Sequence, residues 1–296
     1  MVAVKVADVT LTFMAVHAHP DDEATGTGGV FAKAAAEGIR TVLVTCTDGR
    51  CGDGPGGVKP GDAAHDVDAV VKVRAGELER STKVLGIDVV EQLGYHDSGM
   101  MGWDTNTLPG AFWNTPVAEA AARLADLMRT HRPDVVVTYD ANGVYGHPDH
   151  IQAHRITMAA VELLAGEPWQ PAKVYWSSPP YSQMKMWGDL TREFGTEEEK
   201  AGMEKMEAEM NAALARGDRL PMGLPDEELT TWVDVKPWNQ QKFDALSAHA
   251  SQSDSAQMLA LGVERFGAMM GVETFQRVGA APGAPRETDL FEGLER

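Results

Sequence analysis

Short apolar runs alternate with longer amphipathic segments through the first two thirds of the chain. The runs are strand-sized and mostly rich in β-branched residues, whereas the segments between them repeat apolar positions at helical spacing. Apolar strands that alternate with helices are typical of a mostly parallel sheet covered on both faces. We therefore predict an α/β, Rossmann-like, doubly wound fold. Strands are expected at residues 11–18, 41–47, 87–93, 134–139 and 173–177, and helices at 28–38, 66–85, 117–130 and 151–164.

The last third of the chain has a different pattern. Residues 181–219 carry five methionines among many charges and predict one or two helices. A methionine-lined packing face is the favoured interpretation, and a flexible substrate lid is the alternative. A further strand at 229–235, a helix at 239–250 and an irregular tail from Gly279 complete the pattern. We therefore predict a catalytic core at residues 1–178 and a smaller C-terminal α/β extension at 179–296, which packs on the core and shapes the substrate pocket.

Composition narrows the possible partners and location. A formal net charge of −18 argues against broad contact with nucleic acid or anionic membranes. Residues 1–12 lack the features of a signal peptide, and no run approaches the ~18 apolar residues of a membrane span. Two cysteines, Cys46 and Cys51, are too few for a disulfide framework. We expect a cytoplasmic protein, and a homo-oligomer is left open.

The first candidate site is His19-Pro20-Asp21-Asp22-Glu23, directly after the first predicted strand. Loops at this place bind ligands in doubly wound sheets. A dinucleotide site requires glycines there, because backbone amides must approach the pyrophosphate. Three consecutive carboxylates would repel a pyrophosphate. A cation therefore fits this loop better than a nucleotide.

A second, similar segment is His147-Pro148-Asp149-His150, which follows the strand that ends at Tyr139. The first and fourth strands of such a sheet are neighbours at the switch point, so the two segments are expected to meet. Proline suits the first position of a helix, which would make the preceding histidine the cap residue. His19 and Asp22 would then lie close enough to bind one ion.

Two imidazoles and one carboxylate give a metal site with an open position for water. Zinc would suit hydrolysis, and the same donors also hold non-haem iron(II). The spare carboxylates favour hydrolysis, because it needs a base. Asp21 is placed to take a proton from water, and Asp149 is placed to orient His147.

The segments AHPDDE (18–23) and GHPDH (146–150) resemble the LmbE/PIG-L family of zinc-dependent N-deacetylases. The resemblance extends to about residue 164 and implies one zinc ion per chain. It also implies specific roles. The implied zinc ligands are His19, Asp22 and His150. The implied general base is Asp21. His147, held by Asp149, is implied to stabilise the oxyanion together with Tyr145. The implied substrate-binding residues are Arg74 and Asp97.

The resemblance implies removal of an N-acetyl group from an N-acetylglucosamine-containing small molecule, such as N-acetylglucosaminyl-inositol or a natural-product glycoside. One alternative is an amidase of mycothiol S-conjugates, and another is an inactive metal- or sugar-binding protein. Gly26 stands where the amidase pattern has lysine, but residues 286–295 resemble the end of the amidases. The remaining histidines carry less information. His154 is expected to pack, His249 has no assigned mechanism, and His65, His96 and His131 are expected to be ordinary surface or loop residues.

Overall fold

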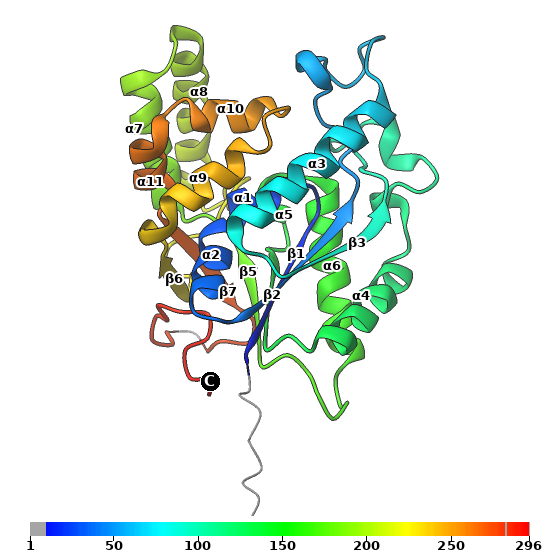
Figure 1. Ribbon diagram of the computed structural model, residues 1–296. Coiled ribbons are helices and arrows are strands. Elements are labelled where there is room, and N and C mark those ends of the chain that lie inside the picture. The colour runs from blue at the N-terminus through cyan, green and yellow to red at the C-terminus, as the bar shows by residue number, and fades with distance from the viewer. Residues whose placement is uncertain (1–9, 282, 296) are drawn as a thin grey trace, which may run out of the picture.

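A seven-stranded sheet runs through the centre of the molecule (Figure 1). The computed structural model describes residues 10–281 and 283–295. The strand order is β3-β2-β1-β4-β5-β7-β6, in which β7 runs antiparallel to both of its neighbours, β5 and β6, and the other neighbouring pairs are parallel. This arrangement confirms the predicted α/β, mostly parallel sheet. The strands are β1 (Thr12–His17), β2 (Arg40–Thr47), β3 (Val89–Tyr95), β4 (Val135–Tyr139), β5 (Lys173–Ser177), β6 (Thr231–Asp234) and β7 (Val272–Arg277).

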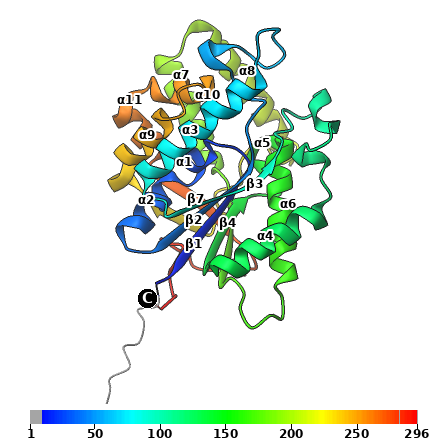
Figure 2. The same cartoon turned by 45° about the vertical axis from the view of Figure 1, so that its right-hand side comes forward.

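Helices cover both faces of the sheet, and β1 shows why. Its side chains alternate, so that Phe13 and Ala15 join one apolar cluster while Met14 and Val16 join the other. All four are fully buried, as expected of a central parallel strand. The first cluster is covered by α2 (Gly28–Ala36), α3 (Val67–Leu85), α9 (Asn239–Ser247) and α11 (Gly262–Met270), and the second by α4 (Val117–His131) and α6 (Pro148–Leu163) (Figures 1 and 2).

The C-terminal third continues the same sheet. Helices α7 (Tyr181–Phe194) and α8 (Glu197–Ala215) form a hairpin, and α10 (Ser253–Leu259) follows α9. Of the five methionines in the hairpin, Met184 is buried and the others are half-buried, as a packing face requires. Because β6 and β7 extend the sheet beyond β5, the extension shares the core. The division at residue 178 stays a prediction.

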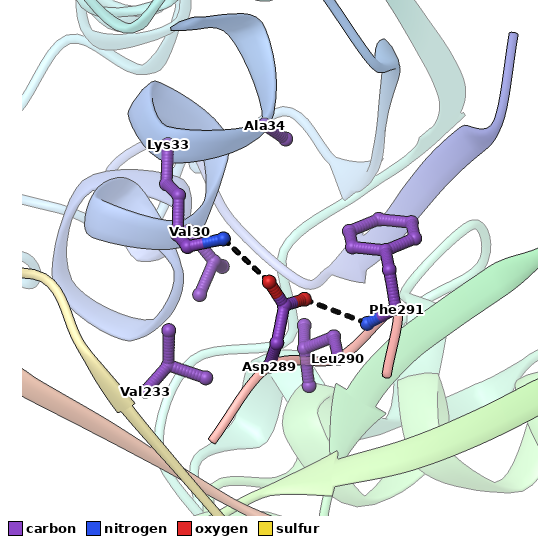
Figure 3. Close-up of a pocket in the computed structure, with 7 residues that line it drawn as sticks. All are labelled: Val30, Lys33, Ala34, Val233, Asp289, Leu290 and Phe291. Atoms are coloured by element: carbon purple, nitrogen blue, oxygen red, sulfur yellow. Dashed lines mark hydrogen bonds and ion pairs between the residues drawn. The ribbon is translucent and has the colours of Figure 1, made fainter. Parts of the chain in front are cut away.

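The irregular C-terminal tail is anchored on α2 and β1. Asp289 accepts hydrogen bonds from Lys33 Nζ at 2.6 Å and from the backbone N–H of Phe291 at 2.8 Å (Figure 3). The Phe291 ring then packs edge-on against Phe13, with 6.2 Å between centroids. The Phe291–Phe13 ring contact and the hydrogen bonds of Asp289 thus hold this irregular segment on the core.

Several local details differ from the expectations. The first helix of the His19 loop, α1 (Asp22–Gly26), begins at Asp22 with Asp21 as its N-cap, so His19 is not a cap. The expectation was wrong because Asp21 takes a positive φ of 112°, which interrupts the helical turn. The second loop behaves as predicted: His147 caps α6 and Pro148 is its first residue. The pattern also missed β7, α10, α11 and the short α5 (Gly143–Gly146).

Neither a signal peptide nor a membrane-spanning segment is expected from the sequence. The absence of a signal peptide rests mainly on residues 1–9, which lie outside the described residues. Within the described ranges, none of the helices has the length and apolar character needed to cross a bilayer. Cys46 is buried and Cys51 is half-buried, and both are free thiols.

Candidate metal centre and active site

The two His-Pro-Asp segments meet at the carboxyl ends of β1 and β4. These strands are parallel neighbours, with Phe13 opposite Val135. The loop after β1 carries His19 and Asp22, and the first turn of α6 carries His150. The three side chains are buried or nearly so, although 131 positions separate the two histidines. The geometry therefore brings together the residues that the sequence pattern paired.

The distances between the donor atoms suit a small tetrahedral cation. His19 Nδ1 lies 3.3 Å from Asp22 Oδ2 and 3.3 Å from His150 Nε2, and His150 Nε2 lies 3.4 Å from Asp22 Oδ1. Ligands about 2.0–2.1 Å from a tetrahedral zinc ion stand roughly 3.3–3.4 Å from one another. Imidazole and carboxylate donors also match the chemistry of zinc. These three residues thus fit a zinc ion.

Two other combinations of side chains also lie close enough to hold a cation. His19, His147 and His150 have ligand atoms within 4.8 Å of one another, as do His19, Asp97 and Asp149. The ring centroids of His19 and His147 are 4.6 Å apart. His147 therefore borders the centre closely and belongs to one of these alternative donor sets.

The far nitrogen of His19 faces carboxylates. Its Nε2 lies 3.3 Å from Asp149 Oδ2 and 3.6 Å from Asp97 Oδ1. A carboxylate on the second nitrogen of a metal-binding imidazole fixes its tautomer and strengthens it as a ligand. Burial alone would lower the pKa of His19, but Asp97, Asp149 and Asp22 raise it well above the ordinary value. So many carboxylates beside one imidazole favour a cation here.

The predicted link from the Asp149 carboxylate to His147 was wrong. That carboxylate contacts His19 and accepts a 2.8 Å hydrogen bond from the backbone N–H of Ser98. His147 Nδ1 is occupied instead by the backbone N–H of Asp149, at 3.2 Å, because His147 is the N-cap of α6. Asp149 therefore orients His147 through its main chain and His19 through its side chain.

This cap bond also fixes the proton of His147. Since Nδ1 accepts from the backbone, the neutral ring carries its proton on Nε2. Burial and the neighbouring His19 and His150 lower the pKa of His147 to about 2, so the ring is neutral at physiological pH. A neutral Nε2–H beside the metal ligands is suited to donate a hydrogen bond to a substrate oxygen.

Two residues that the sequence analysis did not single out support His150. The Tyr139 ring stacks on the His150 ring, with 4.2 Å between centroids and 13° between planes. The Tyr139 hydroxyl accepts from the backbone N–H of Ala18 at 2.9 Å and lies 3.1 Å from His17 Nδ1. The only sequence signal was position: Tyr139 ends the strand before the second segment, and His17 precedes the first.

Asp21 stands beside the donor triad in a strained backbone conformation. Its carboxylate Oδ2 accepts a 2.7 Å hydrogen bond from Arg74 of α3. Burial raises the pKa of Asp21 to about 6, an increase that Asp22 reinforces and Arg74 opposes. A carboxylate with a pKa near neutrality can both take and return a proton at physiological pH.

The two predicted substrate-binding residues, Arg74 and Asp97, are buried and engaged with the protein. Arg74 is 3% exposed and, besides Asp21, donates to the backbone carbonyls of Pro20 and Gly49. The carboxylate of Asp97 accepts from the backbone N–H groups of Cys51 and Gly99. Both residues border the site, and a direct role in substrate binding stays a prediction.

Tyr145 is the most exposed of the predicted residues, at 45%, and its ring centroid lies 5.1 Å from that of His150. The residue before it, Val144, has a φ of 66°, and its N–H donates to Asp140 Oδ1 at 3.1 Å. The loop thus places the exposed Tyr145 ring beside His147 and His150.

The other histidines are placed as follows. His154 contacts the backbone carbonyl of Tyr139 and the Trp176 ring, which confirms packing. His65 contacts the backbone carbonyl of Gly52, and His131 contacts the Glu91 carboxylate. His249 is fully buried and lies 2.7 Å from Glu23, a contact that no local pattern signalled.

Known proteins resemble this chain along most of its length. It is 42% identical to 1D-myo-inositol 2-acetamido-2-deoxy-alpha-D-glucopyranoside deacetylase of Salinispora arenicola, over 94% of this chain and 90% of that protein. The protein of the same name from Thermobispora bispora is 40% identical, over 94% and 97%.

Solved structures share the fold at lower identity. N,N'-diacetylchitobiose deacetylase from Pyrococcus horikoshii aligns with a TM-score of 0.57 and 19% identity, over 92% of this chain and 84% of that one. A 4-carboxy-2-hydroxymuconate hydratase from Pseudomonas putida aligns with a TM-score of 0.58 and 18% identity, over 92% and 98%. Since a hydratase shares the fold, the fold alone does not define the reaction.

The family model described as GlcNAc-PI de-N-acetylase, PIG-L, matches residues 14–161, which span both metal-binding segments. This match, together with the relatives above, confirms the predicted class of enzyme, an amide hydrolase. The chain belongs to the PIG-L family of de-N-acetylases.

Proposed function

We propose that this protein is a zinc-dependent N-deacetylase that hydrolyses the acetamide of N-acetylglucosaminyl-inositol. The observation that carries the proposal is the convergence of His19, Asp22 and His150 beside Asp21. The substrate is inferred from the relatives, which are named as deacetylases of this glycoside and match nearly the whole chain. Hydrolysis adds water across the amide bond and gives acetate and the free amine.

The metal proposed for the centre is one zinc ion per chain, bound by His19 Nδ1, the Asp22 carboxylate and His150 Nε2. Zinc at this position supplies Lewis-acid polarisation of the acetamide carbonyl and lowers the pKa of the attacking water. The same donor set also accepts iron(II), so the metal in the cell depends partly on supply.

Asp21 is proposed as the general base. Its carboxylate takes the proton of the attacking water and later gives it to the nitrogen of the leaving amine. Arg74 holds this carboxylate at 2.7 Å and so limits the directions in which it can point. Positioning of this kind keeps the reacting atoms within reach of one another.

His147 is proposed to stabilise the oxyanion. Its Nε2–H is the donor left after the cap bond occupies Nδ1. A hydrogen bond to the carbonyl oxygen becomes stronger as negative charge develops there. The Tyr145 hydroxyl is proposed as a second donor, because its exposed ring lies beside both His147 and His150.

The deacetylase proposal is preferred to the conjugate amidase. The tail that resembles the amidases packs at the amino end of β5, where Glu287 bonds Lys173, and the metal-binding residues lie at the carboxyl ends of the strands. Its sequence therefore says little about the substrate. A natural-product glycoside, a homo-oligomer and a cytoplasmic location remain predictions, and the small-molecule substrate is the one proposed partner.

The test is the release of the free glucosaminyl amine by the zinc-loaded full chain from three substrates, because hydrolysis of an acetamide and hydrolysis of a conjugate's glucosaminyl amide both free this amine. The substrates are N-acetylglucosaminyl-inositol, a simple alkyl N-acetylglucosaminide and a fluorescent mycothiol conjugate. We expect kcat/KM to be at least about 10-fold higher for the first than for either of the others, because interactions with the inositol ring contribute binding energy. Faster cleavage of the conjugate would establish the amidase instead. No turnover of any of the three would refute the proposed function.

A further inference from the structure

Glu23, the last residue of the first motif, is fully buried, and its carboxylate makes three hydrogen bonds within the described residues. Its Oε2 accepts from the backbone N–H of Asp21 at 2.9 Å. Its Oε1 accepts from Ser81 Oγ at 2.5 Å and lies 2.7 Å from His249 Nε2. The carboxylate therefore connects the loop after β1, helix α3 and the turn after α9.

The backbone of Asp21 needs such a support. Its φ of 112° lies in a region that residues with a side chain rarely adopt. A residue held there costs on the order of 1–3 kcal/mol, which the surrounding contacts must offset. The hydrogen bond from the Asp21 N–H to Glu23 acts on the main chain, whereas Arg74 holds the side chain. The two contacts together determine where the Asp21 carboxylate points.

His249 completes this arrangement from 226 positions away in the chain. The imidazole is fully buried, and its Nδ1 has no hydrogen-bond partner among the described residues. An unsatisfied buried nitrogen opposes folding, so the ring is a poor choice for stability alone. Within the described residues, the ring makes one hydrogen bond, to Glu23, and this contact is the role that the position of the ring supports. Glu23 in turn is a buried carboxylate, which requires a cationic or strongly donating partner.

We propose that His249 and Glu23 are positioning residues that hold the main chain of Asp21 in its left-handed conformation and thereby aim its carboxylate at the metal centre. The inference rests on the proposed function, because it assigns these residues to the base of that reaction. It also gives the C-terminal extension a part in the site, through the turn that follows α9.

The experiment compares His249→Met with His249→Gln in the zinc-loaded full chain. Methionine fills a similar volume without a donor, while the glutamine amide reaches about the position of Nε2 and can still donate to Glu23. His131→Met is the matched control, since His131 is also nearly buried and lies 2.8 Å from the Glu91 carboxylate. The readouts are kcat, KM, zinc per chain, Tm and the φ of Asp21 in crystal structures of the variants.

We expect His249→Met to lower kcat by about 10–100-fold through misplacement of Asp21. Zinc content should equal that of wild type, and KM should change little. His249→Gln should restore most of the kcat, and His131→Met should lower Tm without changing kcat. In His249→Met crystals, the φ of Asp21 should leave the left-handed region.

Three results would overturn the inference. The first is a wild-type kcat in His249→Met, and the second is a loss of zinc that accounts for the loss of kcat. If His249→Met does not fold, His249→Asn replaces it, because its shorter amide ends before the Nε2 position. The third result is that neither His249→Met nor His249→Asn folds, since this would show that the contact between His249 and Glu23 serves folding. If wild type releases no acetate, the proposed function fails, and the φ of Asp21 in the variants still tests this inference.

Discussion

Arg74 donates a 2.7 Å hydrogen bond to the carboxylate of Asp21, and the two residues are 53 positions apart. The family resemblance implied that this arginine binds substrate. In the structure it is 3% exposed and also donates to the carbonyls of Pro20 and Gly49. A guanidinium with three acceptors on the motif and its neighbouring loop is held rigidly. Arg74 thus links the glycine-rich loop to the proposed base.

The close approach of Gly49 to Arg74 gives the first prediction. A Cβ at Gly49 would lie 2.3 Å from the Arg74 guanidinium, so Gly49→Ala must displace it. We expect kcat to fall by at least about 10-fold as Asp21 loses its partner. Gly57→Ala is the matched control, because Gly57 has a similar positive φ of 79° and nothing within 4 Å of its Cβ. Each substitution costs roughly 1–2 kcal/mol of backbone strain. Equal kcat in the two variants would contradict the role given to Arg74.

Asp21→Asn tests the base. Asparagine has the same shape, tolerates a positive φ and can still accept from Arg74, but it cannot take a proton at neutral pH. Turnover should fall by roughly 10²–10⁴ while zinc content stays at the wild-type level. The measurement is single-turnover acetate release together with elemental analysis. Wild-type activity in this variant would remove Asp21 from the mechanism.

His147 and Asp22 are separated by their effects on metal content. Both border the centre, and His147 belongs to one of the alternative donor sets. We expect His147→Ala to keep its zinc and to lose about 10²–10³ in kcat through the missing hydrogen bond to the oxyanion. Asp22→Ala should lose zinc, because it removes a ligand. If His147→Ala lost its zinc and Asp22→Ala kept it, His147 would be the metal ligand and Asp22 would not.

Zinc binding should also stabilise the folded chain. An ion that binds the native state and not the unfolded chain raises Tm in proportion to the logarithm of its concentration above Kd. We therefore expect removal of zinc with a chelator to lower the Tm of wild type, and readdition to restore it. Asp22→Ala should show no such response. A Tm of wild type that does not depend on zinc would contradict a bound ion at these residues.

The strands and the meeting of the two motifs could be predicted because both follow from local pattern. β1 and β4 are apolar runs, and parallel strands of this kind end at one edge of the sheet. β7 was missed for a physical reason. It buries Glu273, whose charge is matched by Lys242 at 2.7 Å, so its sequence lacks an apolar run. A buried ion pair hides a strand from any rule based on hydropathy.

The partners of the site residues could not be predicted in the same way. The sequence placed Asp149 beside His147, because the two are close in the chain. The structure turns the Asp149 carboxylate to His19 instead, since the backbone of Asp149 already satisfies His147 Nδ1. The contact of His249 with Glu23 spans 226 positions. Periodicity and motif spacing describe neighbours along the chain, and such contacts depend on how the elements pack.

The ion-pair cluster around Glu287 predicts how stability depends on pH. Lys173 Nζ, the Tyr175 hydroxyl and Thr231 Oγ1 each donate to this carboxylate, at 2.7–2.9 Å. Burial alone would raise the pKa of Glu287, but these hydrogen bonds lower it below the ordinary value of 4.5. The folded state therefore holds this proton less tightly than the unfolded state.

The stabilisation by Glu287 is consequently complete above pH 4.5 and is lost as the pH falls through the lower pKa of the folded state. We expect Glu287→Gln to lower the free energy of unfolding at pH 7, with a difference from wild type that shrinks below pH 4.5. Urea unfolding of both chains between pH 7 and pH 3 measures it. Glu79→Gln is the control, because Glu79 pairs with Lys83 on an exposed helix face, where ion pairs contribute little. A Glu287→Gln difference that stays constant over this pH range would show that the cluster acts through packing, and not through the charge of Glu287.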